Sequence, residues 1–94
     1  LYSVNPMWRP EYAVFPDHPV TRGVKPFATR DEWYFNMRWT ASTNGLTPLL
    51  VAKPSDDVRK GPYVWPHGPY KHIIAQSGQP EVMMWAFERP DGGR

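Results

Sequence analysis

Proline is the feature that most restricts what this chain can fold into. Proline accounts for 12 of the 94 residues, and inside a helix or a central strand it removes a backbone hydrogen-bond donor. Long regular elements are therefore not expected in proline-dense segments such as residues 62–69. Aromatic residues make up 15% of the chain, and this much apolar area argues against disorder. We expect a folded, loop-rich region whose turns are stiffened by proline.

Apolar stretches between the prolines carry the patterns of β-strands. From Phe27 to Trp39, large apolar side chains alternate with more polar ones, which is typical of a strand with two different faces. Residues 46–52 (LTPLLVA) form a short apolar run that predicts a buried strand. Residues 81–89 (EVMMWAFER) are apolar on both faces and predict a central strand covered on both sides. Such coverage needs more layers than 94 residues supply, which indicates a larger domain.

The segments between these stretches predict turns, short helical turns and exposed loops. Residues 19–22 are predicted to form one helical turn, capped by Asp17 and ended by Gly23. Residues 53–61 are polar and are predicted to be exposed. Residues 71–76 fit either a short strand or a helical turn, and residues 77–80 (SGQP) predict a turn.

Charge and composition exclude several classes of function. The net charge is only +2, from 11 basic and 9 acidic residues, and the basic residues are dispersed along the chain. A nucleic-acid partner is not predicted, because such binding needs clustered positive charge. The chain has no cysteine, which excludes a Cys nucleophile and thiolate metal sites in this stretch. No segment reaches the roughly 20 apolar residues of a membrane helix.

His18 and the pair Asp31 and Glu32 are the candidates for catalytic chemistry. A histidine brought next to a carboxylate can act with it in general acid/base catalysis. Glu32 is followed by Trp33 and Tyr34, and desolvation by these rings would raise the pKa of its carboxyl group. The competing interpretation is that Asp31 and Glu32 are the solvated start of a strand and that His18 is a turn residue.

Other polar and aromatic residues suggest binding more than catalysis. His67 and His72 lie five positions apart, a spacing that fits no standard zinc pattern, so no metal site is predicted. Trp65 and Tyr63 lie on the proline-stiffened loop, where they are either ligand contacts or packing anchors. Trp85 lies in the middle of an apolar strand and is predicted to be a core residue.

Several blocks, taken in order, form a recognisable pattern. They are SVNP with Trp8 (3–8), HPVTRGVKPF (18–27), DEWYFNMR (31–38), GPYVWP (61–66) and MWAFERPDGGR (84–94). This order resembles the trehalose-utilisation (ThuA-like) family over nearly the whole chain. The HPVTRG and DEWY blocks are the most specific parts of the resemblance.

The resemblance implies an α/β fold like that of class I glutamine amidotransferases, a doubly wound, flavodoxin-like sheet with helices on both faces. Residues 1–94 would be a partial version of it, rich in strands and proline-stiffened loops, from a single ThuA-like domain truncated at both ends. The early parallel strands would precede Leu1, and a strand ending in a Gly-His block would follow Arg94. The elbow that carries the glutaminase Cys would also lie outside the chain, so amidotransferase chemistry is not predicted.

The resemblance also implies a role in bacterial carbohydrate utilisation, acting on or binding a sugar such as trehalose or a related disaccharide. The residues carried over or favoured are Glu32, His18 and Asp31 as catalytic groups and Arg22, Tyr34 and Trp65 as substrate contacts. No cofactor and no metal are predicted. The alternative is a non-catalytic glycan- or protein-binding module that uses loop aromatics, and single-stranded nucleic-acid binding is the least favoured reading. Whether the protein is an enzyme, its compartment (cytoplasm or periplasm) and its oligomeric state stay open.

Overall fold

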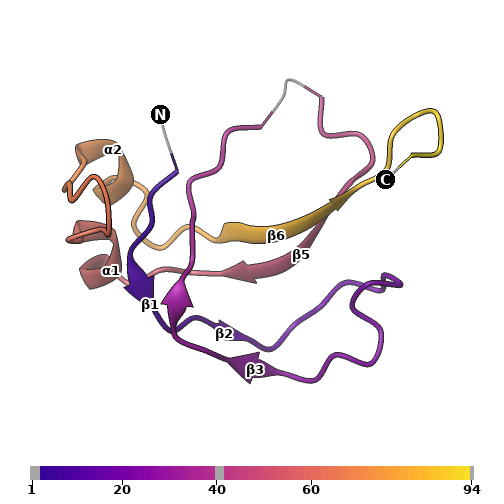
Figure 1. Ribbon diagram of the computed structural model, residues 1–94, viewed down its shortest axis with the longest axis horizontal. Helices are drawn as coiled ribbons and strands as arrows, with labels where there is room; N and C mark the ends of the chain where they lie inside the picture. Colours follow the sequence, from indigo (N-terminus) through magenta and orange to yellow (C-terminus); the bar gives the residue numbers. More distant parts are fainter. Residues whose placement is uncertain (1–2, 40–41, 94) are drawn as a thin grey trace.

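The computed structural model describes residues 3–39 and 42–93, and these contain six strands and two short helices. In chain order the elements are β1 (Met7–Trp8), β2 (Glu11–Tyr12), β3 (Phe27–Ala28), β4 (Asp31–Glu32), β5 (Leu46–Ala52), α1 (Asp56–Lys60), α2 (Lys71–Ile74) and β6 (Glu81–Phe87). The strands pair into antiparallel two-stranded sheets, β1 with β4, β2 with β3 and β5 with β6. In Figure 1 the helices lie at one end of the molecule and the β2–β3 connection at the other.

The first four strands form a single interrupted ladder. The Val4–Phe35 bridge, the β1–β4 pair and the β2–β3 pair all keep the same register. Val4 and Phe35 exchange both backbone hydrogen bonds, so every second residue after Val4 occupies a hydrogen-bonded position. Pro6 and Pro10 occupy two of these positions and have no N–H to donate. Proline therefore divides what would be one hairpin into strands of two residues.

The strand predicted from Phe27 to Trp39 is thus only partly correct. Within this range, β3, β4 and the bridge residue Phe35 are paired as strand residues. Phe35 is buried and its neighbour Tyr34 is exposed, as the alternation predicted. The regular pairing stops at Asn36, whose φ of 63° lies in the left-handed region. The lengths of β3 and β4 are therefore set by Pro6 and Pro10 in the partner segment, more than by the alternation of apolar and polar residues.

The β5–β6 hairpin confirms two predicted strands and corrects the environment of one. β5 has the predicted bounds, with Leu49 and Leu50 buried, and the register shifts between Pro48 and Leu50. β6 ends at Phe87, two residues earlier than predicted. Among the described strands it pairs with β5 alone, and Met84, Trp85 and Phe87 are exposed. The prediction of a central strand covered on both sides is wrong for this chain.

Helix α1 lies in the segment that was predicted to be a polar, exposed loop. The Ser55 side chain accepts a hydrogen bond from the backbone N–H of Val58 at 3.2 Å, and Gly61 follows the last turn. Asp56 and Asp57 are in the first turn, where acidic side chains favour a helix. These start and stop signals were present in the sequence and were overlooked. For residues 71–76, the helical alternative is confirmed by α2.

The predicted helical turn after Asp17 exists as a hydrogen-bonded turn. The His18 carbonyl accepts from the backbone N–H groups of Thr21 at 3.0 Å and Arg22 at 3.1 Å, and Gly23 follows with φ 82°. The capping side chain is His18 and not Asp17, because His18 Nδ1 accepts from the Val20 N–H at 3.1 Å. The turn is too short to be a helix. His18 lines a hollow together with residues of the β5–β6 hairpin.

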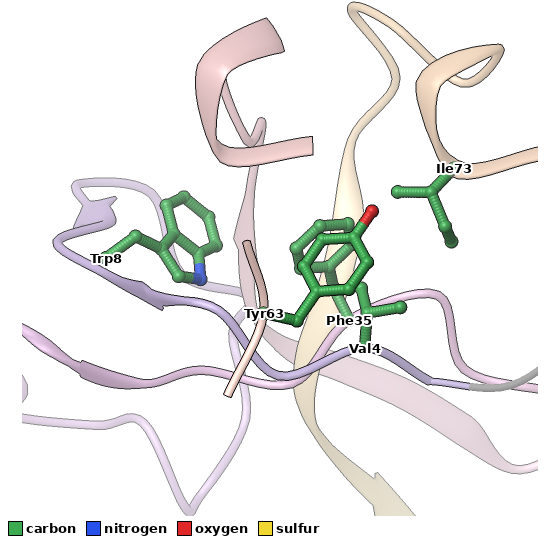
Figure 2. Close-up of a cluster of buried hydrophobic side chains, with 5 residues drawn as sticks. All are labelled: Val4, Trp8, Phe35, Tyr63 and Ile73. Carbon is green, nitrogen blue, oxygen red and sulfur yellow. The ribbon is translucent and has the colours of Figure 1, made fainter. Parts of the chain in front are cut away.

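The hydrophobic core joins the ladder to the helices. Figure 2 shows its buried members, Val4, Trp8, Phe35, Tyr63 and Ile73. The rings of Trp8 and Phe35 meet edge to face at 5.9 Å. Tyr63, predicted as either a ligand contact or an anchor, is 2% exposed and is therefore an anchor. Helices and antiparallel sheets thus share one core, which is a mixed α and β architecture.

Candidate functional site

Exposed aromatic rings lie together where β6 meets Trp39. Trp85 and Phe87 are two residues apart in β6 and are 40% and 41% exposed. The Trp39 ring meets the Trp85 ring edge to face at 5.0 Å and 82°. We call Trp39, Trp85 and Phe87 the aromatic strip. The prediction that Trp85 is a core residue is wrong, since no described strand lies over this part of β6.

A hollow of about 440 Å³ lies between the aromatic strip and the turn at residues 18–20, and we call it the His18 hollow. Its lining residues are His18, Pro19, Val20, Gly45, Thr47, Trp85, Ala86, Phe87 and Glu88. Figure 1 shows the β2–β3 connection on the same side of the molecule as the end of β6, which is how these distant segments meet. The volume falls within the ~300–1,000 Å³ typical of small-molecule sites.

A second hollow of about 290 Å³ uses the same two β6 rings, and we call it the Arg38 hollow. Its lining residues are Arg38, Trp39, Ser42, Thr43, Leu46, Trp85 and Phe87. Because Trp85 and Phe87 line both hollows, one ligand lying along the strip would reach polar groups from two different segments.

The polar edge of the His18 hollow has a defined hydrogen-bonding direction. The Val20 N–H donates to His18 Nδ1, so in the neutral ring the proton is on Nε2. His18 therefore offers an N–H donor from Nε2, and Thr47 adds a hydroxyl to the same lining. Aromatic faces with donors and acceptors at the edge suit a ligand that has an apolar face and several polar groups.

Glu32 and Trp65, both predicted as site residues, are brought together by Asn5. The Asn5 side-chain Nδ2 donates to Glu32 Oε1 at 2.7 Å, and its Oδ1 accepts from the Trp65 backbone N–H at 3.1 Å. Asn5 itself is buried, whereas the Trp65 side chain is 73% exposed. A half-buried carboxylate and an exposed indole are thus connected through one fixed amide.

The proposed pairing of His18 with the carboxylates has no counterpart among the described contacts. Asp31 Oδ1 accepts from the Glu32 backbone N–H at 2.7 Å, and the Glu32 carboxylate is held by Asn5. No hydrogen bond or ion pair within residues 3–39 and 42–93 joins His18 to Asp31 or Glu32. Of the predicted residues, His18 therefore lines the hollow beside the aromatic strip. Glu32 and Trp65 meet at Asn5, and we call these three residues the Asn5 cluster.

Two further predicted contacts are accessible. Arg22 lies in the same turn as His18, and its guanidinium is 3.5 Å from the Asp17 carboxylate in an exposed ion pair. Tyr34 is exposed between β4 and the bridge residue Phe35. Neither lines the two hollows at the aromatic strip.

Sequence reasoning missed Asn5 and Arg59, whose importance depends on partners far along the chain. Arg59 is 1% exposed, although it was predicted to be in an exposed loop. Its guanidinium lies 3.3 Å from Glu81 Oε2 and donates to the Gln79 carbonyl at 2.7 Å. Apart from the helix signals around α1, the sequence carries no local mark of this burial.

The two remaining histidines have partners of other kinds. His67 Nδ1 is 3.0 Å from the Tyr63 carbonyl oxygen, and the His72 ring stacks on Tyr70 at 5.7 Å. In the part of the chain that the structure describes, no three His, Asp or Glu side chains are grouped to hold a metal ion. Neither helix in that part is long and apolar enough to cross a membrane.

Comparison of the chain with protein-family models, with curated proteins and with solved structures found no match.

Proposed function

We propose that this chain is a sugar-binding part of a ThuA-like domain in carbohydrate utilisation, and that the sugar lies on the aromatic strip. The observation that carries the proposal is that Trp85 and Phe87 line two adjoining hollows, one of which includes His18. The doubly wound, flavodoxin-like sheet belongs to the same proposal, as the architecture of the larger domain.

The chemistry of the strip supports a sugar as ligand. A pyranose has an apolar face of C–H groups, which packs on an aromatic ring, and hydroxyl groups around its edge. In the His18 hollow, His18 and Thr47 carry an imidazole N–H and a hydroxyl group, which suit such hydroxyls. The acidic residue Glu88 belongs to the same lining.

Glu32 has a separate place in the proposal. As the general acid or base, Glu32 would act on a sugar bound beside the Trp65 loop and not on the aromatic strip, with its carboxyl group oriented by the Asn5 amide. The non-catalytic alternative also uses Trp65, as a glycan- or protein-binding aromatic on the loop between α1 and α2. In Figure 1 this loop lies at the opposite end of the molecule from the end of β6, so the two sites are separable by mutation.

Titration calorimetry with trehalose and glucose tests where the sugar binds. Trp85→Ala should weaken binding by about fivefold or more, because stacking on one aromatic ring is worth ~1–3 kcal/mol for nucleobases. Trp65→Ala is the matched control and should bind as the parent chain does. If Trp65→Ala loses binding and Trp85→Ala keeps it, the strip is not the site and the loop alternative holds.

Turnover separates an enzyme from a binding module. In the full-length domain, Glu32→Gln should abolish turnover of a sugar bound beside the Trp65 loop, because the amide cannot exchange a proton as the carboxyl group does. Binding without turnover in the parent protein would favour the non-catalytic module. Full activity in Glu32→Gln would rule out the catalytic role of Glu32.

A further inference from the structure

The Arg38 hollow differs in charge from the His18 hollow. Its lining residues include Arg38 and the hydroxyl-bearing residues Ser42 and Thr43, and no Asp or Glu is among the described ones. The lining of the His18 hollow, in contrast, includes the acidic residue Glu88. The two ends of the strip therefore favour different groups on a ligand.

Arg38 itself is exposed, and no ion pair or hydrogen bond involves it among the described residues. A guanidinium has five N–H donors and no acceptor, and its planar fork matches two oxygens of a carboxylate or a phosphate. Charge-assisted bonds of this kind are about twice as strong as bonds between neutral groups. An oxyanion is thus the ligand group that fits this hollow best.

Building on the sugar-binding function proposed above, we propose that the sugar is acidic: it carries an oxyanion, a carboxylate or a phosphate, on the ring that occupies the Arg38 hollow. The ring packs on Trp85 and Phe87, and the oxyanion meets Arg38 at the edge of the strip. Thr43 lines the same hollow, and its hydroxyl group would be a second donor for the oxyanion. The strip would then select by charge as well as by ring shape.

Calorimetry with three probes of similar ring size tests this preference: glucose, glucuronate and glucose 6-phosphate. At low salt, at least one acidic sugar should bind about tenfold more tightly than glucose, and the ratio should shrink as salt rises, because the contact is exposed. The two acidic probes separate a carboxylate ligand from a phosphate ligand. Acetate and inorganic phosphate alone should bind much more weakly, because they lack the ring.

Arg38→Gln should bring the ratio of the affinity for an acidic sugar to the affinity for glucose close to one. Arg30→Gln removes an exposed arginine outside both hollows and should leave the ratio as it is. If glucose binds as tightly as both acidic sugars, or the preference survives Arg38→Gln, the inference is wrong while sugar binding stands. If neither glucose, trehalose nor an acidic sugar binds, the proposed function itself is wrong.

Discussion

The guanidinium of Arg59 lies 3.3 Å from the carboxylate of Glu81, and this pair joins helix α1 to the first residue of β6. Arg59 also lies over the Phe35 ring, with its Cζ 5.5 Å from the ring centroid. The other carboxylate oxygen of Glu81 accepts from the Asn36 backbone N–H at 3.1 Å. One buried ionic group thus contacts the ladder, a helix and the β5–β6 hairpin.

Replacing Arg59 with Met should destabilise the fold by about 3–5 kcal/mol, the usual cost of removing one partner of a buried ion pair. The cost arises because Glu81, whose side chain is 12% exposed, would lose its counter-charge. Urea unfolding followed by circular dichroism measures the change. Arg22→Met, in the exposed pair with Asp17, is the matched control and should change stability by no more than about 1 kcal/mol. Equal effects in both variants would contradict the role given to Arg59.

Replacing Asn5 with Asp should make stability depend on pH in a new way. The change keeps the acceptor for the Trp65 N–H but puts a second carboxylate against Glu32. Repulsion raises the pKa of the pair in the folded state, so the folded protein binds more protons than the unfolded chain. Stability should therefore be highest at acid pH and fall as the pair ionises.

Unfolding free energies of Asn5→Asp and the parent chain, compared between about pH 3 and pH 7 across the ordinary carboxyl range, measure this effect. Asn44→Asp adds the same charge at an exposed position and serves as control. If the difference in unfolding free energy between Asn5→Asp and the parent chain does not grow with pH, then Glu32 does not contact residue 5.

Two buried tyrosines should respond in opposite ways to loss of the hydroxyl group. The Tyr12 hydroxyl is buried without a hydrogen-bond partner among the described residues, whereas the Tyr63 hydroxyl donates to the Arg59 carbonyl. Tyr12→Phe should leave stability unchanged or raise it, because an unsatisfied buried group is costly. Tyr63→Phe should lower stability by about 1–3 kcal/mol, because the Arg59 carbonyl loses its partner. The opposite order in urea unfolding would contradict the described environments.

The same two tyrosines should limit stability in alkali. Burial raises the pKa of the Tyr12 hydroxyl well above its usual range, and desolvation likewise raises the pKa of Tyr63. Above about pH 10, tyrosines of the unfolded chain lose protons while these two stay neutral in the folded state. The unfolding free energy should therefore fall as pH rises past that value. Tyr12→Phe should show a shallower fall than the parent chain, and an unchanged slope would argue against the raised pKa.

Gly68 should tolerate alanine much less than Gly23 does. Both residues have positive φ, 63° and 82°, a conformation that costs an L residue about 1–2 kcal/mol. At Gly68 an added Cβ would also collide with Cε2 of the Tyr63 ring, while at Gly23 nothing lies within 4 Å. Gly68→Ala should therefore lose more stability than Gly23→Ala, and the urea midpoints of the two variants measure the difference. Equal losses would show that the Tyr63 ring moves away at little cost.

Local patterns in the sequence predicted the elements whose signals are local. The bounds of β5, the strand character of β6 and the turn at residues 18–23 follow from apolar runs and turn residues. Helix α1 was also predictable, because Ser55 and Gly61 are ordinary start and stop residues. The strand at 27–39 was overextended because periodicity does not show which prolines lie opposite in the partner strand.

The candidate site was harder to predict because its geometry depends on long-range packing. Exposure of Trp85 depends on how many strands flank β6, which the composition of β6 alone does not reveal. The Asn5 cluster joins residues that no spacing rule connects. His18 was predicted either as a partner of the carboxylates or as a turn residue. It lies in the turn, and residues of the β5–β6 hairpin line the same hollow.

The hydrogen bond between Asn5 and Trp65 joins residues 60 positions apart in the sequence, so it cannot form until most of the chain has been synthesised. The ladder of residues 4–35 can pair early, but Asn5 stays without the Trp65 N–H until the later segment has left the ribosome. Contacts of such sequence separation slow folding, because a long loop must be closed before they form. The nascent N-terminal half should thus be a target for chaperones until residue 65 and the β6 segment emerge.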